Sequence, residues 1–359
     1  MLHFPSKSSH IAWSPQHGCE IVSSTTSGIA ESGYSTDRHE APKRTHKSRD
    51  IHRGFCYHEL IMSGTIKLKP CFLIEIITPK KFKLNGLWFG PEKPKRAIIF
   101  VHGLSSSAFQ TSLAEAFVDK ETAVITFSNR GHNKIAKIYR LDNTKKGYHS
   151  VLAGQAHEVF TDCVDDIQGV INFVKNVGVR DIYLAGHSTG CQKSVYYASR
   201  KGNQKNIKGI ILLAPLSDYA AAVKFDTDGK LAKATKVAQD LVRKGRKHEL
   251  LPKSVAPNPI DAQRFLSLYT PDSTEEVFTY AQPKKNPHAF KNIEVPILVL
   301  LAGNDEYGDR SAEDIAMWFE KHANSKRFSA NVISGTRHSF TGKEKSVADS
   351  VEKWMTSKK

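Results

Sequence analysis

The sequence lacks the hydrophobic segments that mark membrane and secreted proteins. It has no run of about 18 apolar residues that could cross a bilayer as a helix, and its N-terminus has no continuous apolar core of a signal peptide. Cysteine is also scarce, and the five residues are widely spaced without a C-x-x-C pair: Cys19, Cys56, Cys71, Cys163 and Cys191. An odd, scattered set argues against a disulfide framework and against structural zinc. We therefore expect no membrane span and a cytoplasmic location.

Acidic residues are fewer than basic ones. Lysine and arginine total 52 against 36 aspartate and glutamate residues, which gives a formal net charge of +16. The basic residues are spread along the chain, and no motif interleaves them with aromatic residues. The excess therefore favours solubility rather than nucleic-acid binding. We expect no nucleic-acid partner, and the sequence leaves the oligomeric state open.

Residues 1–60 show neither helical nor strand periodicity and are rich in serine, threonine, histidine and lysine. A segment of this composition cannot bury enough apolar surface to fold, which predicts a disordered N-terminal tail. Residues 61–359 alternate between apolar runs and helical patterns. This alternation predicts one globular domain.

The central motif of this domain is Gly186-x-Ser188-x-Gly190. An apolar run enters the motif and a helical pattern leaves it, which predicts a strand, a sharp turn and a helix. In a nucleophile elbow of this spacing the serine adopts a strained backbone conformation. The two glycines remove side chains that would collide where the strand and the helix meet. A plain Gly/Ser turn is the alternative that the motif alone leaves open.

Further apolar runs predict an α/β fold with a mostly parallel sheet between helices. Strands are expected at residues 72–77, 83–89, 97–101, 122–127, 182–187, 207–214, 295–302 and 328–333. Helices are expected at about 108–118, 155–174 and 346–355. The second of these helices carries four acidic residues, which we interpret as a solvated face and not as a metal site: Glu158, Asp162, Asp165 and Asp166.

The segment of about 220–291, between the sixth and seventh expected strands, has no strand pattern. It is too long for a simple crossover connection, so we interpret it as a helical cap inserted over the strand ends. Helices are expected within it at about 230–244 and 260–269. Its lysines and arginines would favour an acidic substrate, although an exposed helix face is the commoner explanation for them.

Ser188, Asp305 and His338 occur in the order serine, acid, histidine, and each follows an expected strand. The carboxyl ends of parallel strands meet at one edge of a sheet, so these side chains should converge. A serine hydroxyl becomes a useful nucleophile when an imidazole takes its proton, and a carboxylate orients that imidazole. We predict this triad, with Asp309 and then Asp218 as alternative acids.

Acyl transfer also needs N–H donors for the developing oxyanion. The strand at 97–101 ends in His102-Gly103-Leu104, and we expect the N–H groups of Leu104 and Thr189 to form this oxyanion hole. Five polar side chains near the strand ends are candidates for substrate contact: His102, Arg130, His132, His187 and Asp218. For the first three, a structural hydrogen-bonding role is the favoured alternative.

Residues 65–357 resemble the α/β-hydrolase superfamily. The octet AGHSTGCQ at 185–192 and the segment EVFTDCVDDI at 158–167 resemble a family of largely unassigned function whose fungal relatives include siderophore esterases. The resemblance implies a core of about eight strands, a helical cap after the sixth, a Ser-acid-His triad and no cofactor. Asp305 lies two residues after Gly303, where many relatives have three, which leaves the choice of acid open.

Together these observations predict a serine hydrolase that cleaves an ester, thioester or small amide of a small-molecule acyl substrate through an acyl-enzyme, without metal or cofactor. Two alternatives remain from the sequence. An acyltransferase would use the same triad with an alcohol or amine in place of water. A non-catalytic binding protein of the same fold would have no need for the strained turn and the triad together.

Overall fold

The computed structural model describes residues 70–226 and 228–357, all within the compact unit Ile66–Lys359. The tail expected at residues 1–60 lies outside the described residues. Among the described residues, no helix is both long and apolar enough to cross a membrane.

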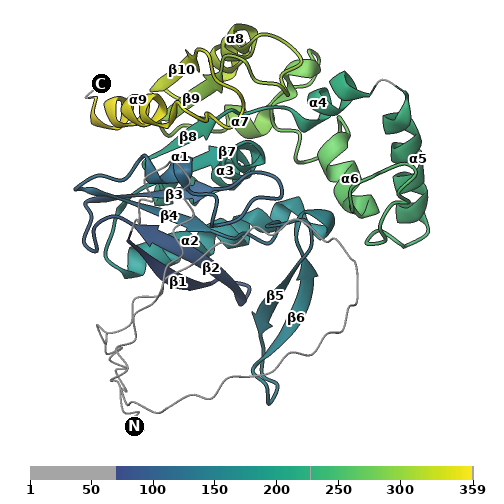
Figure 1. Cartoon of the computed structure of the whole chain (residues 1–359), viewed down its shortest axis with the longest axis horizontal. Coiled ribbons are helices and arrows are strands. Elements are labelled where there is room, and N and C mark those ends of the chain that lie inside the picture. The colour runs from purple at the N-terminus through teal and green to yellow at the C-terminus, as the bar shows by residue number, and fades with distance from the viewer. Residues whose placement is uncertain (1–69, 227, 358–359) are drawn as a thin grey trace, which may run out of the picture. The chain divides into compact units, whose positions relative to one another are not determined.

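One mostly parallel sheet organises the described chain (Figure 1). Its strands run in the spatial order β10-β9-β8-β7-β3-β4-β2-β5-β6, and β1 pairs with β2. Their bounds are Cys71–Ile77 (β1), Phe82–Phe89 (β2), Arg96–Val101 (β3), Thr122–Phe127 (β4), Ala136–Leu141 (β5), Tyr148–Ala153 (β6), Asp181–His187 (β7), Gly209–Leu213 (β8), Ile297–Ala302 (β9) and Phe328–Ile333 (β10). The strands from β4 through β3, β7, β8 and β9 to β10 are parallel.

Helices cover both faces of this sheet. Their bounds are Ser112–Glu115 (α1), Cys163–Asn176 (α2), Thr189–Ser199 (α3), Asp218–Phe225 (α4), Lys230–Arg243 (α5), Ala262–Tyr269 (α6), His288–Lys291 (α7), Ala312–His322 (α8) and Glu344–Thr356 (α9). Helices α2, α3 and α8 contribute to one apolar core, and α1 and α9 contribute to the other.

Strand β3 shows why its sequence is apolar throughout. Ile99 and Val101 belong to the core on one face, whereas Ile98 and Phe100 belong to the core on the other face. Successive side chains of a strand point to opposite faces, so a strand covered on both sides has no position for a polar residue. The strand expected at 97–101 is confirmed, and its burial on both faces explains why its sequence is apolar.

The cap follows β8 and consists of α4, α5, α6 and α7 with their connections. Helices α5 and α6 lie within one residue and two residues, respectively, of the ranges expected from the sequence. They share a small apolar core that includes Ala234, Leu251 and Phe265, and Leu104 from the loop after β3 packs against it. The cap therefore has its own hydrophobic contacts and also touches the loop after β3.

The sheet has ten strands among the described residues, not about eight, because β5 and β6 form a hairpin that the sequence did not reveal. In Figure 1 this hairpin extends from the end of the sheet near β2. Its side chains are mostly exposed, as in Tyr139 and Leu152. A strand without a buried face lacks the apolar run on which the other strands were recognised.

The helix expected at 108–118 is also wrong in extent, since only Ser112–Glu115 is helical. The preceding backbone is held by contacts outside a helix. The N–H of Ala108 donates to Ser128 Oγ at 3.1 Å, and its carbonyl accepts from Thr126 Oγ1 at 2.8 Å. These bonds fix the segment to β4 and leave it unavailable for helical hydrogen bonding.

The expected helix at 155–174 is interrupted at Glu158, whose backbone is extended (φ −61°, ψ 129°). The interruption turns the Glu158 side chain inward. Its Oε1 lies 2.6 Å from Lys193 Nζ on α3, and its Oε2 lies 2.8 Å from Arg264 Nη2 on α6. Buried charges are stable when they are paired, so these ion pairs explain the break in the helix.

The interpretation of the acidic residues on this helix as a solvated face is therefore wrong. Glu158, Asp165 and Asp166 are buried. Arg130, which is 7% exposed, binds both aspartates, with Nη2 at 2.9 Å from Asp165 Oδ2 and Nε at 2.7 Å from Asp166 Oδ1. Each buried carboxylate has a basic partner that lies far away in the sequence.

A buried ion-pair cluster joins the cap to the helix that follows the elbow. It comprises Glu158, Lys193, Arg264 and Glu275, and Arg264 pairs with both glutamates. Lys193 is 1% exposed and Arg264 is fully buried. Because unpaired buried charges are strongly unfavourable, the cluster fixes α6 of the cap against α3 of the core.

Candidate active site

Ser188 lies between β7 and α3 with φ 55° and ψ −128°, a conformation that L-residues rarely adopt. The contacts around it hold this geometry. The N–H of Ser188 donates to Leu213 O at 3.0 Å, and its carbonyl accepts from Cys191 N at 2.8 Å. Strain of this kind persists only where the surrounding structure enforces it.

Three glycines make this turn possible. A Cβ on Gly186 would overlap the carbonyl of Gly190, and a Cβ on Gly190 would overlap the carbonyl of Val101. A Cβ on Gly103 would lie 2.9 Å from Ser188 Cβ. The glycine spacing recognised in the sequence thus allows strand, helix and the loop after β3 to approach one another.

His338 follows β10 and Asp305 follows β9, and the two side chains meet. His338 Nδ1 lies 2.8 Å from Asp305 Oδ2. The N–H of His338 donates to Glu306 Oε2 at 3.0 Å, and the Tyr307 ring packs edge-on against the imidazole at 4.9 Å between centroids. Three consecutive residues of one loop therefore contact His338. Sequence reasoning assigned no role to Glu306 or Tyr307, because their contacts depend on the adjacent strand.

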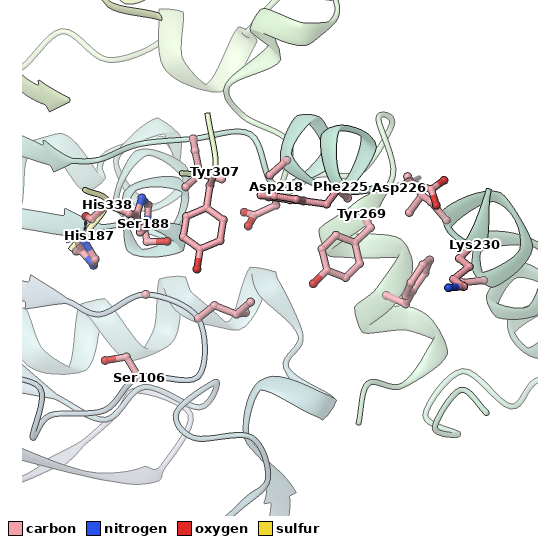
Figure 2. A pocket seen from close by; sticks show the side chains of 18 of the residues that line it. Ser106, His187, Ser188, Asp218, Phe225, Asp226, Lys230, Tyr269, Tyr307 and His338 are labelled. Carbon is pink, nitrogen blue, oxygen red and sulfur yellow. Dashed lines mark hydrogen bonds between the residues drawn. The ribbon is translucent and has the colours of Figure 1, made fainter. Parts of the chain in front are cut away.

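Ser188 and His338 line the same cavity of about 600 Å³. Figure 2 shows the two side chains next to each other at one end of this cavity. Gly103 and Leu104 line it from the core side, and residues of α4, α5 and α6 line it from the cap. The serine, the imidazole and the expected oxyanion loop are therefore brought together.

The expected oxyanion donors, Leu104 and Thr189, lie in two segments next to Ser188. Thr189 is the first residue of α3, and the first N–H groups of a helix have no intrahelical acceptor. Leu104 follows Gly103, and a Cβ added to Gly103 would lie 3.4 Å from Ser188 Oγ. Both N–H groups thus belong to segments that adjoin Ser188.

The three candidate acids, Asp305, Asp309 and Asp218, differ in their surroundings. Asp305 contacts His338, whereas Asp309 pairs with Arg310 (Oδ2 to Nη2, 2.8 Å). Asp218 lines the cavity and accepts a hydrogen bond from Gln192 Nε2 at 2.6 Å. The geometry favours Asp305 as the partner of the imidazole.

His187 precedes Ser188 and lies against the loop that carries His338. Its Nε2 lies 2.9 Å from the carbonyl oxygen of His338, and the two rings are 5.1 Å apart between centroids. Burial lowers the pKa of His187 to about 4, and the nearby His338 adds to this effect. The side chain is therefore neutral at physiological pH and lines the cavity as a hydrogen-bonding group.

His102 is held by the backbone around it. Its Nδ1 lies 2.8 Å from Gly103 O, and its Nε2 accepts a hydrogen bond from Asn129 N at 3.2 Å. Burial lowers the pKa of His102 to about 3, and the charge of Lys193 lowers it further. Both ring nitrogens are used within the protein, so the structure places His102 in a structural position.

Arg130 and His132 lie outside the cavity that holds Ser188. Arg130 is engaged by the carboxylates described above, and its Nη1 also lies 3.2 Å from Asp162 Oδ2. His132 Nδ1 lies 2.8 Å from the carbonyl oxygen of Asn129. Both residues fix the loop after β4. Within the described part of the chain, no group of three or more His, Cys, Asp or Glu side chains is placed to hold a metal ion.

Glu276 supports the cap at the start of α4, and it predicts a pH effect on stability. Its Oε1 accepts from Ser217 Oγ at 2.5 Å, and burial raises the pKa of Glu276 from 4.5 to about 7. As pH rises from 4.5 to 7, the unfolded chain loses this proton while the folded protein retains it, so the folded state becomes less stable. The glutamine variant has no such proton to lose. We therefore expect the free energy of unfolding of Glu276→Gln, relative to that of the wild type, to rise by roughly 2 to 3 kcal/mol from pH 5 to pH 8.

Urea unfolding at the two pH values measures this difference. Glu249→Gln is the matched control, because Glu249 is exposed on the cap and pairs with Arg246. Its stability should follow the wild type at both pH values. Parallel profiles for the wild type and Glu276→Gln would show that Glu276 does not titrate differently on folding.

No curated protein sequence matches this chain. Among solved structures, siderophore hydrolase EstB from Aspergillus fumigatus aligns with a TM-score of 0.56 at 18% identity, covering 80% of this chain and 97% of that chain. The α/β hydrolase GrgF from Penicillium sp. sh18 gives 0.55 at 15% identity, covering 80% and 98%. The esterase Pf2001 from Pyrococcus furiosus gives 0.51 at 16% identity, covering 80% and 91%. These similarities establish the α/β-hydrolase fold.

The model of a family described as a protein of unknown function (DUF1749) matches residues 149–358. This chain belongs to the DUF1749 family. The resemblance inferred from the octet at 185–192 is confirmed. The match spans the region in which Ser188, Asp305 and His338 lie, so the candidate site of this DUF1749 protein falls within the part that its family defines. The loop after β3, with Gly103 and Leu104, precedes the matched region.

Proposed function

We propose that this DUF1749 protein is a serine hydrolase that cleaves an ester, thioester or small amide through Ser188, His338 and Asp305. The observation that carries the proposal is the placement of a strained serine and a carboxylate-bound histidine in one cavity. Ester hydrolysis is also the activity named for the Pf2001 structure, and siderophore hydrolysis is named for EstB. Both share the fold of this chain, which supports the reaction class.

In the proposed reaction, His338 accepts the proton of Ser188 Oγ as the oxygen attacks the acyl carbon. Asp305 holds Nδ1 of the imidazole, so that Nε2 is free to act as the base and the resulting positive charge is stabilised. The N–H groups of Leu104 and Thr189 donate to the oxyanion of the tetrahedral intermediate. His338 then gives its proton to the leaving group, and the acyl-enzyme remains.

Hydrolysis of the acyl-enzyme follows the same route with water as the nucleophile. His338 takes a proton from water, the hydroxide attacks the acyl carbon, and the proton returns to Ser188 Oγ as the acid leaves. Glu306 supports both steps as a positioning residue, because its carboxylate holds the backbone N–H of His338. The cavity of about 600 Å³ fits a small-molecule acyl substrate.

Fluorophosphonate labelling tests the activated serine directly. The wild-type protein should form a covalent adduct, and mass spectrometry should locate it on Ser188. Ser188→Ala should show no adduct, because the nucleophile is absent. Ser194→Ala, on the helix α3 that follows Ser188, is the matched control and should label like the wild type.

The probe must also be able to enter the cavity beneath the cap. A smaller sulfonyl fluoride should therefore be used alongside the fluorophosphonate. Failure of both reagents to label a folded wild-type sample would overturn the assignment of Ser188 as a nucleophile. Labelling followed by turnover of an ester panel would support hydrolysis.

A further inference from the structure

The active-site cavity contains a carboxylate that the proposed reaction does not use. Asp218 is the first residue of α4, and Figure 2 shows it between the Ser188 end of the cavity and the cap end. Its Oδ2 accepts a hydrogen bond from Gln192 Nε2 at 2.6 Å, and Gln192 Nε2 also donates to Leu216 O at 3.1 Å. The amide of Gln192 thus fixes the position of the carboxylate.

Aromatic rings stand on both sides of this carboxylate. Tyr307 lies on the Ser188 side, and Phe225 and Tyr269 lie on the cap side (Figure 2). All three line the cavity, and Phe225 and Tyr307 also contact each other edge to face at 6.2 Å between centroids. The faces of aromatic rings attract cations, most strongly where water is excluded.

The charge of the cavity also points to a cation. The only ammonium group among the described residues that line it belongs to Lys230, whose Nζ lies 2.6 Å from Asp228 Oδ2. Asp218, Asp226 and Asp228 contribute three acidic side chains to the same lining. The cavity is therefore acidic, although the whole chain carries a formal net charge of +16.

Without a cation in the cavity, the Asp218 carboxyl favours its protonated form. Burial raises the pKa of the Asp218 carboxyl well above its usual value, and the charges of Glu275 and Glu276 raise it further. A buried carboxylate without a cationic partner is unfavourable. A cation seated in the cavity would stabilise the ionised form.

We propose that the acyl group of the substrate carries an ammonium group, which binds against Asp218 between the rings of Tyr307, Phe225 and Tyr269. This inference rests on the proposed function, since it names the substrate class of the same site. Asp218 is then the residue that sets specificity, while Ser188 and His338 perform the reaction at the adjoining end of the cavity. Of the described basic residues of the cap, only Lys230 lines the cavity, and its ammonium group is paired with Asp228.

A pair of esters that differ only in charge tests the proposal. The first is the 4-nitrophenyl ester of 4-(trimethylammonio)butanoate, and the second is that of 5,5-dimethylhexanoate, in which carbon replaces the nitrogen. The wild type should give a kcat/KM about tenfold or more higher for the cationic ester. Asp218→Asn should bring the ratio of the two values close to about one, because the shape is kept and the charge is lost.

Asp240→Asn is the matched control. Asp240 lies on α5, outside the residues that line the cavity, and pairs with Arg243. Its replacement by asparagine therefore removes the same charge, but from the surface of the cap. It should keep the wild-type ratio. An equal ratio in the wild type and Asp218→Asn would overturn the proposal.

Binding of butyltrimethylammonium, measured by calorimetry, separates the two hypotheses. Binding that Asp218→Asn weakens about tenfold or more, in a protein that neither the fluorophosphonate nor the sulfonyl fluoride labels, would uphold the cation site and overturn the hydrolase. Labelling at Ser188 with neutral-ester turnover, but without this binding, would uphold the hydrolase and overturn the cation site.

Discussion

Replacing Asp305 with asparagine should lower the turnover of an ester substrate by about three to four orders of magnitude. Asp305 Oδ2 lies 2.8 Å from His338 Nδ1, and an asparagine can present its amide N–H to that nitrogen instead. The imidazole would then carry its proton on Nε2 and be unable to accept the proton of Ser188. Initial rates on a 4-nitrophenyl ester and single-turnover kinetics measure the loss.

Asp309→Asn is the matched control for this prediction, because Asp309 lies in the same loop and pairs with Arg310. Its turnover should stay within about threefold of the wild type, in line with the small contribution of an exposed ion pair. Circular dichroism should show both variants folded. If Asp305→Asn retained normal turnover while Asp309→Asn lost it, Asp309 would be the acid.

Replacing Lys193 with methionine should destabilise the protein by about 3 to 5 kcal/mol. Lys193 is 1% exposed, and its Nζ lies 2.6 Å from Glu158 Oε1. Methionine has a similar length but no charge, so Glu158 would share the single cation of Arg264 with Glu275. Urea unfolding followed by tryptophan fluorescence measures the change.

Two further variants test whether that loss comes from the buried ion pair. Lys208→Met removes an exposed partner of Asp181, where the two side chains are 58% and 55% exposed, and should change stability by less than about 1 kcal/mol. Glu158→Gln combined with Lys193→Met should recover part of the loss, because the unpaired carboxylate is gone. A loss from Lys193→Met no larger than that from Lys208→Met would show that the buried pair is not stabilising.

The sequence predicts best the elements that are buried on both sides. The strand at Thr122–Phe127, which is buried throughout, matches its expected range, and the elbow lies where the glycine spacing places it. Continuous apolar runs and glycines that relieve steric overlap are local signals. The meeting of the loops that carry Ser188, Asp305 and His338 could be predicted because parallel strands bring their carboxyl ends to one edge of the sheet.

Features that depend on distant partners could not be predicted. Glu158 breaks a helix because Lys193 and Arg264, distant in the sequence, bind its carboxylate. The sequence offers Asp218 as an alternative acid of the triad. Its hydrogen bond to Gln192 and the rings beside it depend on the folded structure and leave no signal in the sequence. Long-range pairing of charged groups leaves no periodic pattern in the chain.

The position of the cap in the chain bears on the order in which the polypeptide can assemble. All strands from β1 to β8 precede the cap, and β9 and β10 add in turn beyond β8 at one edge of the sheet. Glu158 and Lys193 also precede the cap, so their ion pair needs no residue that is synthesised later. Arg264 follows both residues in the sequence and adds a second ion pair to the same carboxylate. The backbone partners of Ser188 in its turn, Leu213 and Cys191, also precede the cap, so this turn can form before the residues that cover it have left the ribosome.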